Sequence, residues 1–260
     1  MALAKVPEIT AYFWIVKVLT TAMGEATSDY LNQALGPAIA VPIMLIGLGV
    51  ALRLQFRART YVAWTYWLVV VMVSVFGTSA ADALHVGLGI PYVASTLFYL
   101  VVLAAIFAAW YRSERTLSIH SIYTRRRERF YWATVLATFA LGTAGGDMTA
   151  TSMHLGYLSS GVLFAVVIAV PALAHRWGSL NEIAAFWFAY IVTRPLGASF
   201  ADWFDNSRAH GGLDVGTGVV AALLTVAVVV CVGLLTVTGV DARRAATGPH
   251  PLPVLEMEFD

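Results

Sequence analysis

The chain contains one short motif four times, and this repetition limits the folds open to it more than any other feature. In each copy a tryptophan is followed ten residues later by a glycine and five residues after that by an aspartate. Agreement at three positions in four copies, one of them as rare a residue as tryptophan, indicates four related structural units. The copies are Trp14-x9-Gly24-x4-Asp29, Trp67-x9-Gly77-x4-Asp82, Trp132-x9-Gly142-x4-Asp147 and Trp187-x9-Gly197-x4-Asp202.

Composition places these units in a lipid bilayer. Hydrophobic residues make up 59% of the 260-residue chain and charged residues only 12%, and the mean hydropathy is +0.76. So few charges cannot solvate the surface of a water-soluble domain. A hydrocarbon core of roughly 30 Å is crossed by about 20 apolar residues. Such stretches are predicted twice in each copy, at residues 10–32, 37–56, 62–86, 91–111, 130–153, 157–175, 182–204 and 217–239.

The basic residues predict how these spans are oriented. All but three of the 16 Lys and Arg residues lie where the first span of a pair begins or the second ends. By the positive-inside rule this side is the cytoplasm, so both termini are predicted to be cytoplasmic. Two spans per unit give all four copies the same direction, so the repeats are parallel. The net charge of +1 is no basis for binding nucleic acid.

The predicted fold class is therefore all-α: a membrane protein with eight transmembrane helices from four parallel two-helix repeats, with both termini cytoplasmic. The repeats are expected at about residues 10–56, 62–111, 130–175 and 182–239, within a single transmembrane domain of residues 1–239. Residues 240–260 contain three prolines and no hydrophobic periodicity, which is typical of a disordered cytoplasmic tail.

The two spans of each repeat differ in character. The first carries Ser, Thr, Gly and acidic residues, whereas the second is largely Val, Leu and Ala. The first set is therefore expected to face protein and the second set lipid. The motif glycines are expected to let helices approach closely. The tryptophan lies about 22 Å along the helix from the aspartate, so we interpret its ring as an anchor at the cytoplasmic interface.

The motif and the two-span unit resemble a known family, the bacterial membrane proteins with four tandem DUF347 repeats, a repeat of unknown function. The resemblance covers nearly the whole chain up to about Gly239 and is carried by the four tryptophans and by the segments 17–29 and 193–202. It implies a multi-pass protein of the bacterial cytoplasmic (inner) membrane. The family description itself assigns no activity.

Ionisable residues inside the first spans are the strongest candidates for a functional site. Such residues are costly in a bilayer and usually line a pathway or pair with one another. Each first span carries a partly polar stripe, at helical spacing, that ends in the motif aspartate. The alternative is that small polar residues serve packing and that the aspartates lie in the headgroup region. The candidate residues for binding a substrate or ion are Glu25, Asp29, Asp82, Asp147, Asp202, Thr21, Thr78, Thr143, Arg194 and Lys17.

The same residues could hold a metal ion, and a divalent metal is the one cofactor that the pattern suggests. Oxygen ligands favour hard ions such as Mn²⁺ or Mg²⁺, and a histidine would shift the preference towards Zn²⁺ or Fe²⁺. His85 follows Asp82 by three residues, which is a helical spacing. The candidate ligands are Asp29, Asp82, His85 and Asp147, although a lone interfacial histidine is more often simply solvated.

Two classes of function follow from this pattern, with a third that involves no chemistry. The first is a membrane transporter of a small cation, either a divalent metal such as Mn²⁺ or a proton-coupled substrate. The second is a membrane-embedded hydrolase in which Asp and His hold a metal that activates water. The third is a sensor or scaffold. Four equivalent carboxylates at one depth favour transport over enzymatic catalysis, because an enzyme needs only one asymmetric site.

Overall fold

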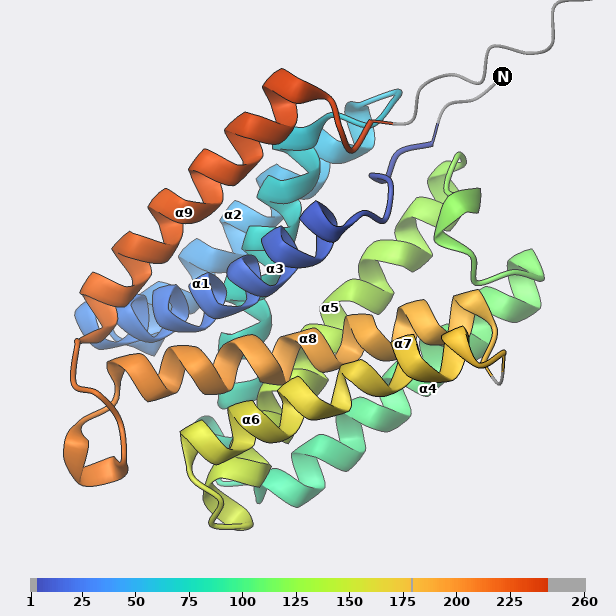
Figure 1. Cartoon of the computed structure of the whole chain (residues 1–260). Coiled ribbons are helices and arrows are strands. Elements are labelled where there is room, and N and C mark those ends of the chain that lie inside the picture. The colour runs from blue at the N-terminus through green and yellow to red at the C-terminus, as the bar shows by residue number, and fades with distance from the viewer. Residues whose placement is uncertain (1–3, 179, 243–260) are drawn as a thin grey trace, which may run out of the picture.

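The computed structural model describes residues 4–178 and 180–242, and within these ranges the regular elements are all helical (Figure 1). Three of the long helices begin at side-chain caps. The side chains of Thr10, Thr124 and Asn181 accept hydrogen bonds from backbone N–H groups in the first turns of α1, α5 and α8. The long helices are α1 (Ala11–Leu35), α2 (Pro37–Arg57), α3 (Ala63–Asp82), α4 (Tyr92–Glu114), α5 (Arg125–Asp147), α8 (Glu182–Asp205) and α9 (Thr217–Thr238).

The remaining elements are short. Helices α6 (Tyr157–Val167) and α7 (Ala169–Arg176) follow one another, and together they occupy the predicted span 157–175. Two π-helical turns, η1 (Ala83–Gly87) and η3 (Met148–Ser152), extend α3 and α5. Two 3₁₀ turns, η2 (Ile119–Ser121) and η4 (Arg208–His210), lie in the connections. Each predicted span therefore falls on helical residues.

Among the described residues, five helices are long and apolar enough to cross a membrane. They are α2, α3 with its π turn as far as His85, α4, α8 and α9. Tyr157–Pro171 is a shorter apolar helix. These helices indicate a membrane protein.

Four helices form an inner ring, and the others surround it. The inner helices are α1, α3, α5 and α8, one from each repeat, and each contacts the next, with α8 contacting α1. Each outer helix packs on the inner helix of the following repeat: α2 on α3, α4 on α5, α6 on α8 and α9 on α1 (Figure 1). The contact between α9 and α1 closes the circle.

Burial agrees with this arrangement and with the predicted difference between first and second spans. The apolar windows of α3 and α8 are each 56% buried, against 22%, 17% and 28% for α2, α4 and α9. The outer helices thus expose most of their apolar side chains, as helices that face lipid do.

The segment before α1 and the residues that follow α9 meet at the end of the ring where the inner helices begin. The backbone N–H of Glu8 donates a hydrogen bond to the carbonyl of Asp241, and the hydroxyl of Tyr61 donates one to the Asp241 carboxylate. Lys5 and Asp241 are both buried, with 6% and 1% of their surface exposed. The rest of the predicted tail, residues 243–260, lies outside the described residues.

Candidate functional site between the inner helices

The motif glycines are the points of closest approach between inner helices. A Cβ added to any of them would overlap the neighbouring helix. Every partner lies three residues before the motif glycine of the next repeat, so the four contacts are equivalent. Gly24 faces Ser74, Gly77 faces Phe139, Gly142 faces Arg194 and Gly197 faces Thr21.

The motif tryptophans form a second set of equivalent contacts. Each ring packs on the aromatic residue that precedes the motif tryptophan of the previous repeat, and the first repeat packs on the fourth. Trp67 lies on Phe13, Trp132 on Tyr66, Trp187 on Tyr131 and Trp14 on Phe186, with ring centroids 5.7, 5.4, 6.2 and 5.7 Å apart. The four repeats therefore form a closed ring with pseudo-four-fold symmetry.

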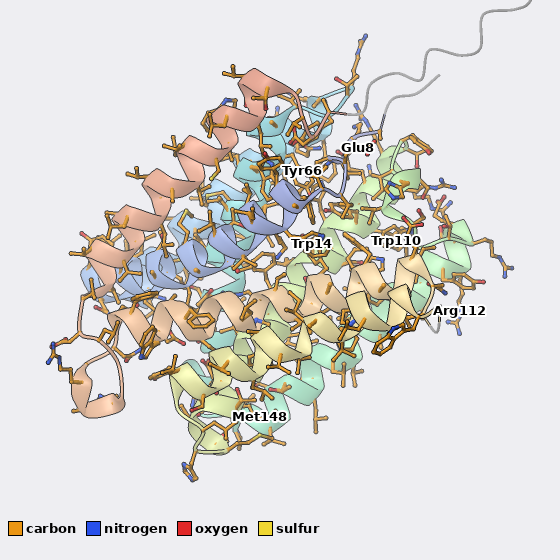
Figure 2. The ribbon with its side chains drawn as sticks, viewed as in Figure 1. Glu8, Trp14, Tyr66, Trp110, Arg112 and Met148 are labelled. Atoms are coloured by element: carbon orange, nitrogen blue, oxygen red, sulfur yellow. The ribbon has the colours of Figure 1, made fainter. Side chains whose placement is uncertain are left out.

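These contacts correct the interpretation of the tryptophans as interfacial anchors. Trp67, Trp132 and Trp187 are at most 5% exposed, and Trp14 is partly buried. Trp187 also donates its indole N–H to the carbonyl of Leu117, at 2.9 Å. The rings point into the bundle, where aromatic pairs add stability beyond their buried area. In Figure 2, Trp14 and Tyr66 lie on the side of the bundle nearest the N-terminus, and Met148 lies at the opposite end.

Arg194 lies at the centre of the polar region. Its guanidinium donates to the carbonyl of Thr21 at 3.0 Å and to the hydroxyl of Thr143 at 2.7 Å, and it also bonds to Glu25 and Thr78. Thr78 in turn donates to Glu25 at 3.2 Å. The side chain is fully buried. Four predicted site residues, Glu25, Thr78, Thr143 and Arg194, are thus in direct contact, together with the backbone of Thr21.

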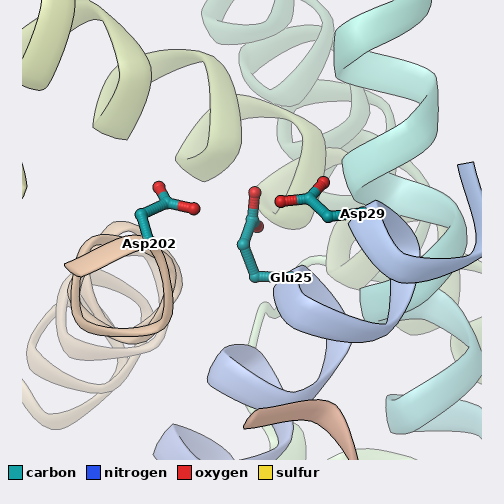
Figure 3. Close-up of side chains that lie close together, drawn as sticks. All are labelled: Glu25, Asp29 and Asp202. Atoms are coloured by element: carbon teal, nitrogen blue, oxygen red, sulfur yellow. The ribbon is translucent and has the colours of Figure 1, made fainter. Parts of the chain in front are cut away.

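Three carboxylates converge beside this arginine. Oxygen atoms of Glu25, Asp29 and Asp202 all lie within 4.8 Å of one another, and the side chains point towards a common space between α1 and α8 (Figure 3). Glu25 and Asp202 are buried, with 4% and 7% of their surface exposed, and Asp29 is partly buried. A cation is the natural partner for such a group, because three like charges at this distance repel one another.

The other two motif aspartates flank this group. Asp82 and Asp147 are the last residues of α3 and α5, and each is followed directly by a π turn. Both lie within electrostatic range of Glu25 and of Arg194. Both are partly buried. π turns inside helices often accompany functional sites, and here they reshape the chain immediately after a motif aspartate.

Asp205 belongs to the same region, although it lies outside the repeated motif. It ends α8 three residues after Asp202, is 7% exposed, and has one carboxylate oxygen without a hydrogen-bond partner in the described structure. The helical spacing from Asp202 was the available signal. It was overlooked because no other copy of the motif has a carboxylate at that position.

Lys17 is the other fully buried cation on the described inner helices, and it has a different environment. Its ammonium nitrogen lies 4.2 Å from the ring centroid of Phe139 and 4.3 Å from that of Tyr190. The side chain is fully buried and has no hydrogen-bond acceptor among the described residues. The aromatic faces attract the charge. Lys17 therefore lies on the tryptophan side of the carboxylates. Aromatic rings surround its ammonium group, whereas Arg194 contacts a carboxylate and hydroxyl groups.

His85 is engaged elsewhere. Its Nδ1 lies 2.7 Å from the carbonyl oxygen of Ile90, and its ring stacks on Tyr92 with centroids 3.4 Å apart. Of the four candidate metal ligands, only Asp29 belongs to the group of converging carboxylates. Metal binding by Asp82, His85 and Asp147 stays a prediction.

Comparison with known proteins agrees with the repeat that the structure shows. The family described as Repeat of Unknown Function (DUF347) matches at residues 12–61, 65–116, 130–178 and 185–241. The chain belongs to the DUF347 family. Each match covers most of one inner helix and the outer helix that follows it. No curated protein and no solved structure matched the chain.

The four DUF347 repeats supply one polar region with unequal contributions. At the position after the motif glycine they carry Glu25, Thr78, Thr143 and Ala198, whereas the motif aspartate occurs in all four. The region described above holds six carboxylates, those of Glu25, the four motif aspartates and Asp205, and two basic side chains, Lys17 and Arg194. The excess negative charge must be neutralised by protons or by cations. The chemistry available is thus reversible binding of a hard cation or of protons.

Proposed function

We propose that this protein is a membrane transporter of a small cation, which binds between the inner helices at Glu25, Asp29 and Asp202. In this proposal the chain crosses the bacterial cytoplasmic membrane eight times and both termini are cytoplasmic. The observation that carries it is the convergence of these three carboxylates within 4.8 Å in a largely buried region. Asp82 and Asp147, within electrostatic range of Glu25, would attract the cation to the same place.

The ligand set indicates the class of cation. The converging groups offer carboxylate oxygens, and hydroxyl oxygens of Thr78 and Thr143 lie close by on Arg194. Oxygen ligands suit hard ions such as Mn²⁺ and Mg²⁺. Protons compete for the same oxygens, so binding should weaken as the pH falls. Coupling to a proton gradient would follow from this competition.

The metal-dependent hydrolase has less support. In the form that the sequence suggests, Asp and His side chains together hold the metal, and the His85 ring is stacked on Tyr92 and bound to the carbonyl of Ile90. Transport uses the symmetrical ring of helices directly, because a site between packed inner helices can be exposed by rocking one repeat against another.

Flux measurements test this proposal. Purified protein in proteoliposomes should move at least one ion from a panel of Mn²⁺, Mg²⁺, Zn²⁺, Na⁺ and K⁺, with or without a pH gradient. Asp29→Asn and Asp202→Asn retain the side-chain size but remove the charge, so each should abolish that flux. Asp214→Asn is the matched control, because Asp214 is an exposed residue in the loop before α9, and it should transport normally.

Two outcomes would contradict the proposal. If the wild-type protein moved none of the ions, the transport function would be rejected. If it moved an ion and neither aspartate variant changed the rate, the carboxylates would be structural and the transport site would lie elsewhere.

A further inference from the structure

Arg194 has a special place in the pseudo-symmetry of the ring. The equivalent positions in the other repeats are Thr21, Ser74 and Phe139, so the basic side chain occurs in one repeat only. Its guanidinium bonds to Glu25, Thr78 and Thr143. These three residues occupy one equivalent position, directly after the motif glycine, in the three other repeats.

A group that contacts the same position of three repeats while anchored in the fourth lies where all four meet. The guanidinium therefore lies on the pseudo-four-fold axis of the inner ring. The fourth residue at this position is Ala198, on α8 itself. Its side chain is small and leaves the centre to Arg194. A guanidinium suits the place because its planar fork presents five donors, which one carboxylate and several neutral oxygens can accept.

The axis is closed on the tryptophan side of this arginine. The ammonium of Lys17 lies against the rings of Phe139 and Tyr190, both fully buried. Beyond it, Tyr66 and Tyr131 meet through their hydroxyl groups at 2.5 Å, within the aromatic belt of the tryptophan contacts. The arginine and the aromatic side chains thus block this direction, so an ion at the carboxylates would have to leave by the aspartate side.

We propose that Arg194 is a tethered cation that occupies the axial position of the site and must leave Glu25 whenever a transported cation crosses the ring. This inference rests on the proposed transport function and adds its gating element. The guanidinium and the transported cation compete for the Glu25 carboxylate. This carboxylate therefore has a positive partner both when the site is empty and when it holds the transported cation. The protein then exchanges one cation for another at a closed axis and does not conduct ions through an open pore.

Chemical rescue tests the axial position. Arg194→Ala removes the side chain and leaves Glu25, Thr78 and Thr143 in place, so the melting temperature in detergent should fall. Free guanidinium ion at millimolar concentration should raise it again, since a ligand that binds only the folded state stabilises it. The same concentration of tetramethylammonium, which has no N–H donors, should not. Wild type and the double variant Arg194→Ala with Glu25→Gln should respond to neither ion.

Arg194→Lys provides a second measurement if the alanine variant does not fold. Lysine keeps the charge but lacks the fork of donors, so it should hold Glu25 less firmly and compete less well with a metal. Its affinity for Mn²⁺, measured by isothermal titration calorimetry, should rise by about tenfold, or roughly 1.4 kcal/mol. Arg208→Lys is the matched control, because Arg208 is exposed on η4, and its Mn²⁺ affinity should equal that of the wild type.

The results separate this inference from the proposed function. If guanidinium stabilised Arg194→Ala no more than tetramethylammonium did, or if Arg194→Lys bound Mn²⁺ no better than wild type, the tethered-cation role would be rejected. Rescue without flux of any cation in the wild type would reject transport and its gating while confirming the axial position. Flux with no rescue would reject the axial role alone.

Discussion

At the scale of single residues, Lys5 and Glu128 show how the protein accommodates charges that are removed from water. The ammonium of Lys5 lies 2.7 Å from a carboxylate oxygen of Glu128, and the two side chains are 7% and 1% exposed. Gln55 donates to the other oxygen of Glu128 at 3.1 Å. Three distant parts of the chain, the N-terminal segment, α2 and α5, are thereby joined by one buried network.

Glu128→Gln should destabilise the protein strongly. The variant leaves the Lys5 ammonium without its counter-charge in a buried place, a change that typically costs about 3–5 kcal/mol. Thermal and denaturant unfolding in detergent would measure the loss. Glu182→Gln is the control, because Glu182 is 74% exposed and pairs with His120 at the surface, where such pairs contribute little. If both substitutions lowered the stability only slightly, the buried pair between Lys5 and Glu128 would not stabilise the fold as proposed.

The residues of the candidate site were largely visible in the sequence, but their partners were not. Lys17 and Arg194 are the cations within the predicted spans, where such residues are rare, and the repeat drew attention to the aspartates. Whether Arg194 or Lys17 would meet Glu25 depends on which repeats adjoin and where each side chain points, and one repeat alone contains neither piece of information. The repeat does not point to Asp205, because no other copy carries a carboxylate at its position.

At the scale of helices, the motif glycine controls how closely neighbours can pack. Gly142 lies against Arg194 and Pro195 of α8, and Gly145, one turn later on the same helix α5, has no atoms near its missing side chain. The same substitution can thus be made at two glycines of one helix, one that contacts a neighbouring helix and one that does not.

Gly142→Ala and Gly145→Ala should shift stability in opposite directions. Alanine is favoured over glycine in a helix by about 1 kcal/mol, so Gly145→Ala should raise the melting temperature. At Gly142 the new methyl group meets Arg194 and Pro195, and overpacking of this kind typically costs about 1–3 kcal/mol. Differential scanning fluorimetry of both purified variants would show the contrast. A stabilising effect at Gly142 would mean that α5 and α8 are less closely packed than the structure shows.

The predicted spans coincided with helical residues because long apolar runs and the glycines and prolines between them are clear signals. The break between α6 and α7 and the π turns after Asp82 and Asp147 were not predicted. Apolar periodicity does not record where the backbone hydrogen-bond pattern changes. The interpretation of the tryptophans as interfacial anchors was wrong, because an amphipathic side chain near a helix end suits either a membrane interface or an aromatic core. Which of the two applies depends on the neighbouring repeats.

At the scale of the whole molecule, the closed ring gives every repeat the same two neighbours. The outer helix of each repeat covers the inner helix of the next, and α9 covers α1. Because every repeat runs in the same direction, the loops that join inner to outer helices lie at one end of the ring. The loops that join one repeat to the next lie at the other end.

This arrangement predicts the results of topology reporters. Fusions after Arg57 and Arg115, at the ends of α2 and α4, should report the cytoplasm. Fusions after Asn32 and Gly211, which follow the polar halves of α1 and α8, should report the outer side. Alkaline phosphatase and green fluorescent protein provide complementary readouts of the two sides. Reporters that place Arg57 and Arg115 on opposite sides would exclude an even number of crossings between them and therefore the two-span repeat.

The ion pair between Glu25 and Arg194 also has a consequence for biosynthesis. Its two partners are 169 residues apart in the chain, which at 5–20 residues per second corresponds to roughly 10–30 s of translation. Throughout that interval the nascent α1 carries its carboxylates with no guanidinium to receive them. If α1 enters the bilayer before α8 is made, its carboxylates bear the cost of ionisable groups in lipid until the Arg194 guanidinium arrives.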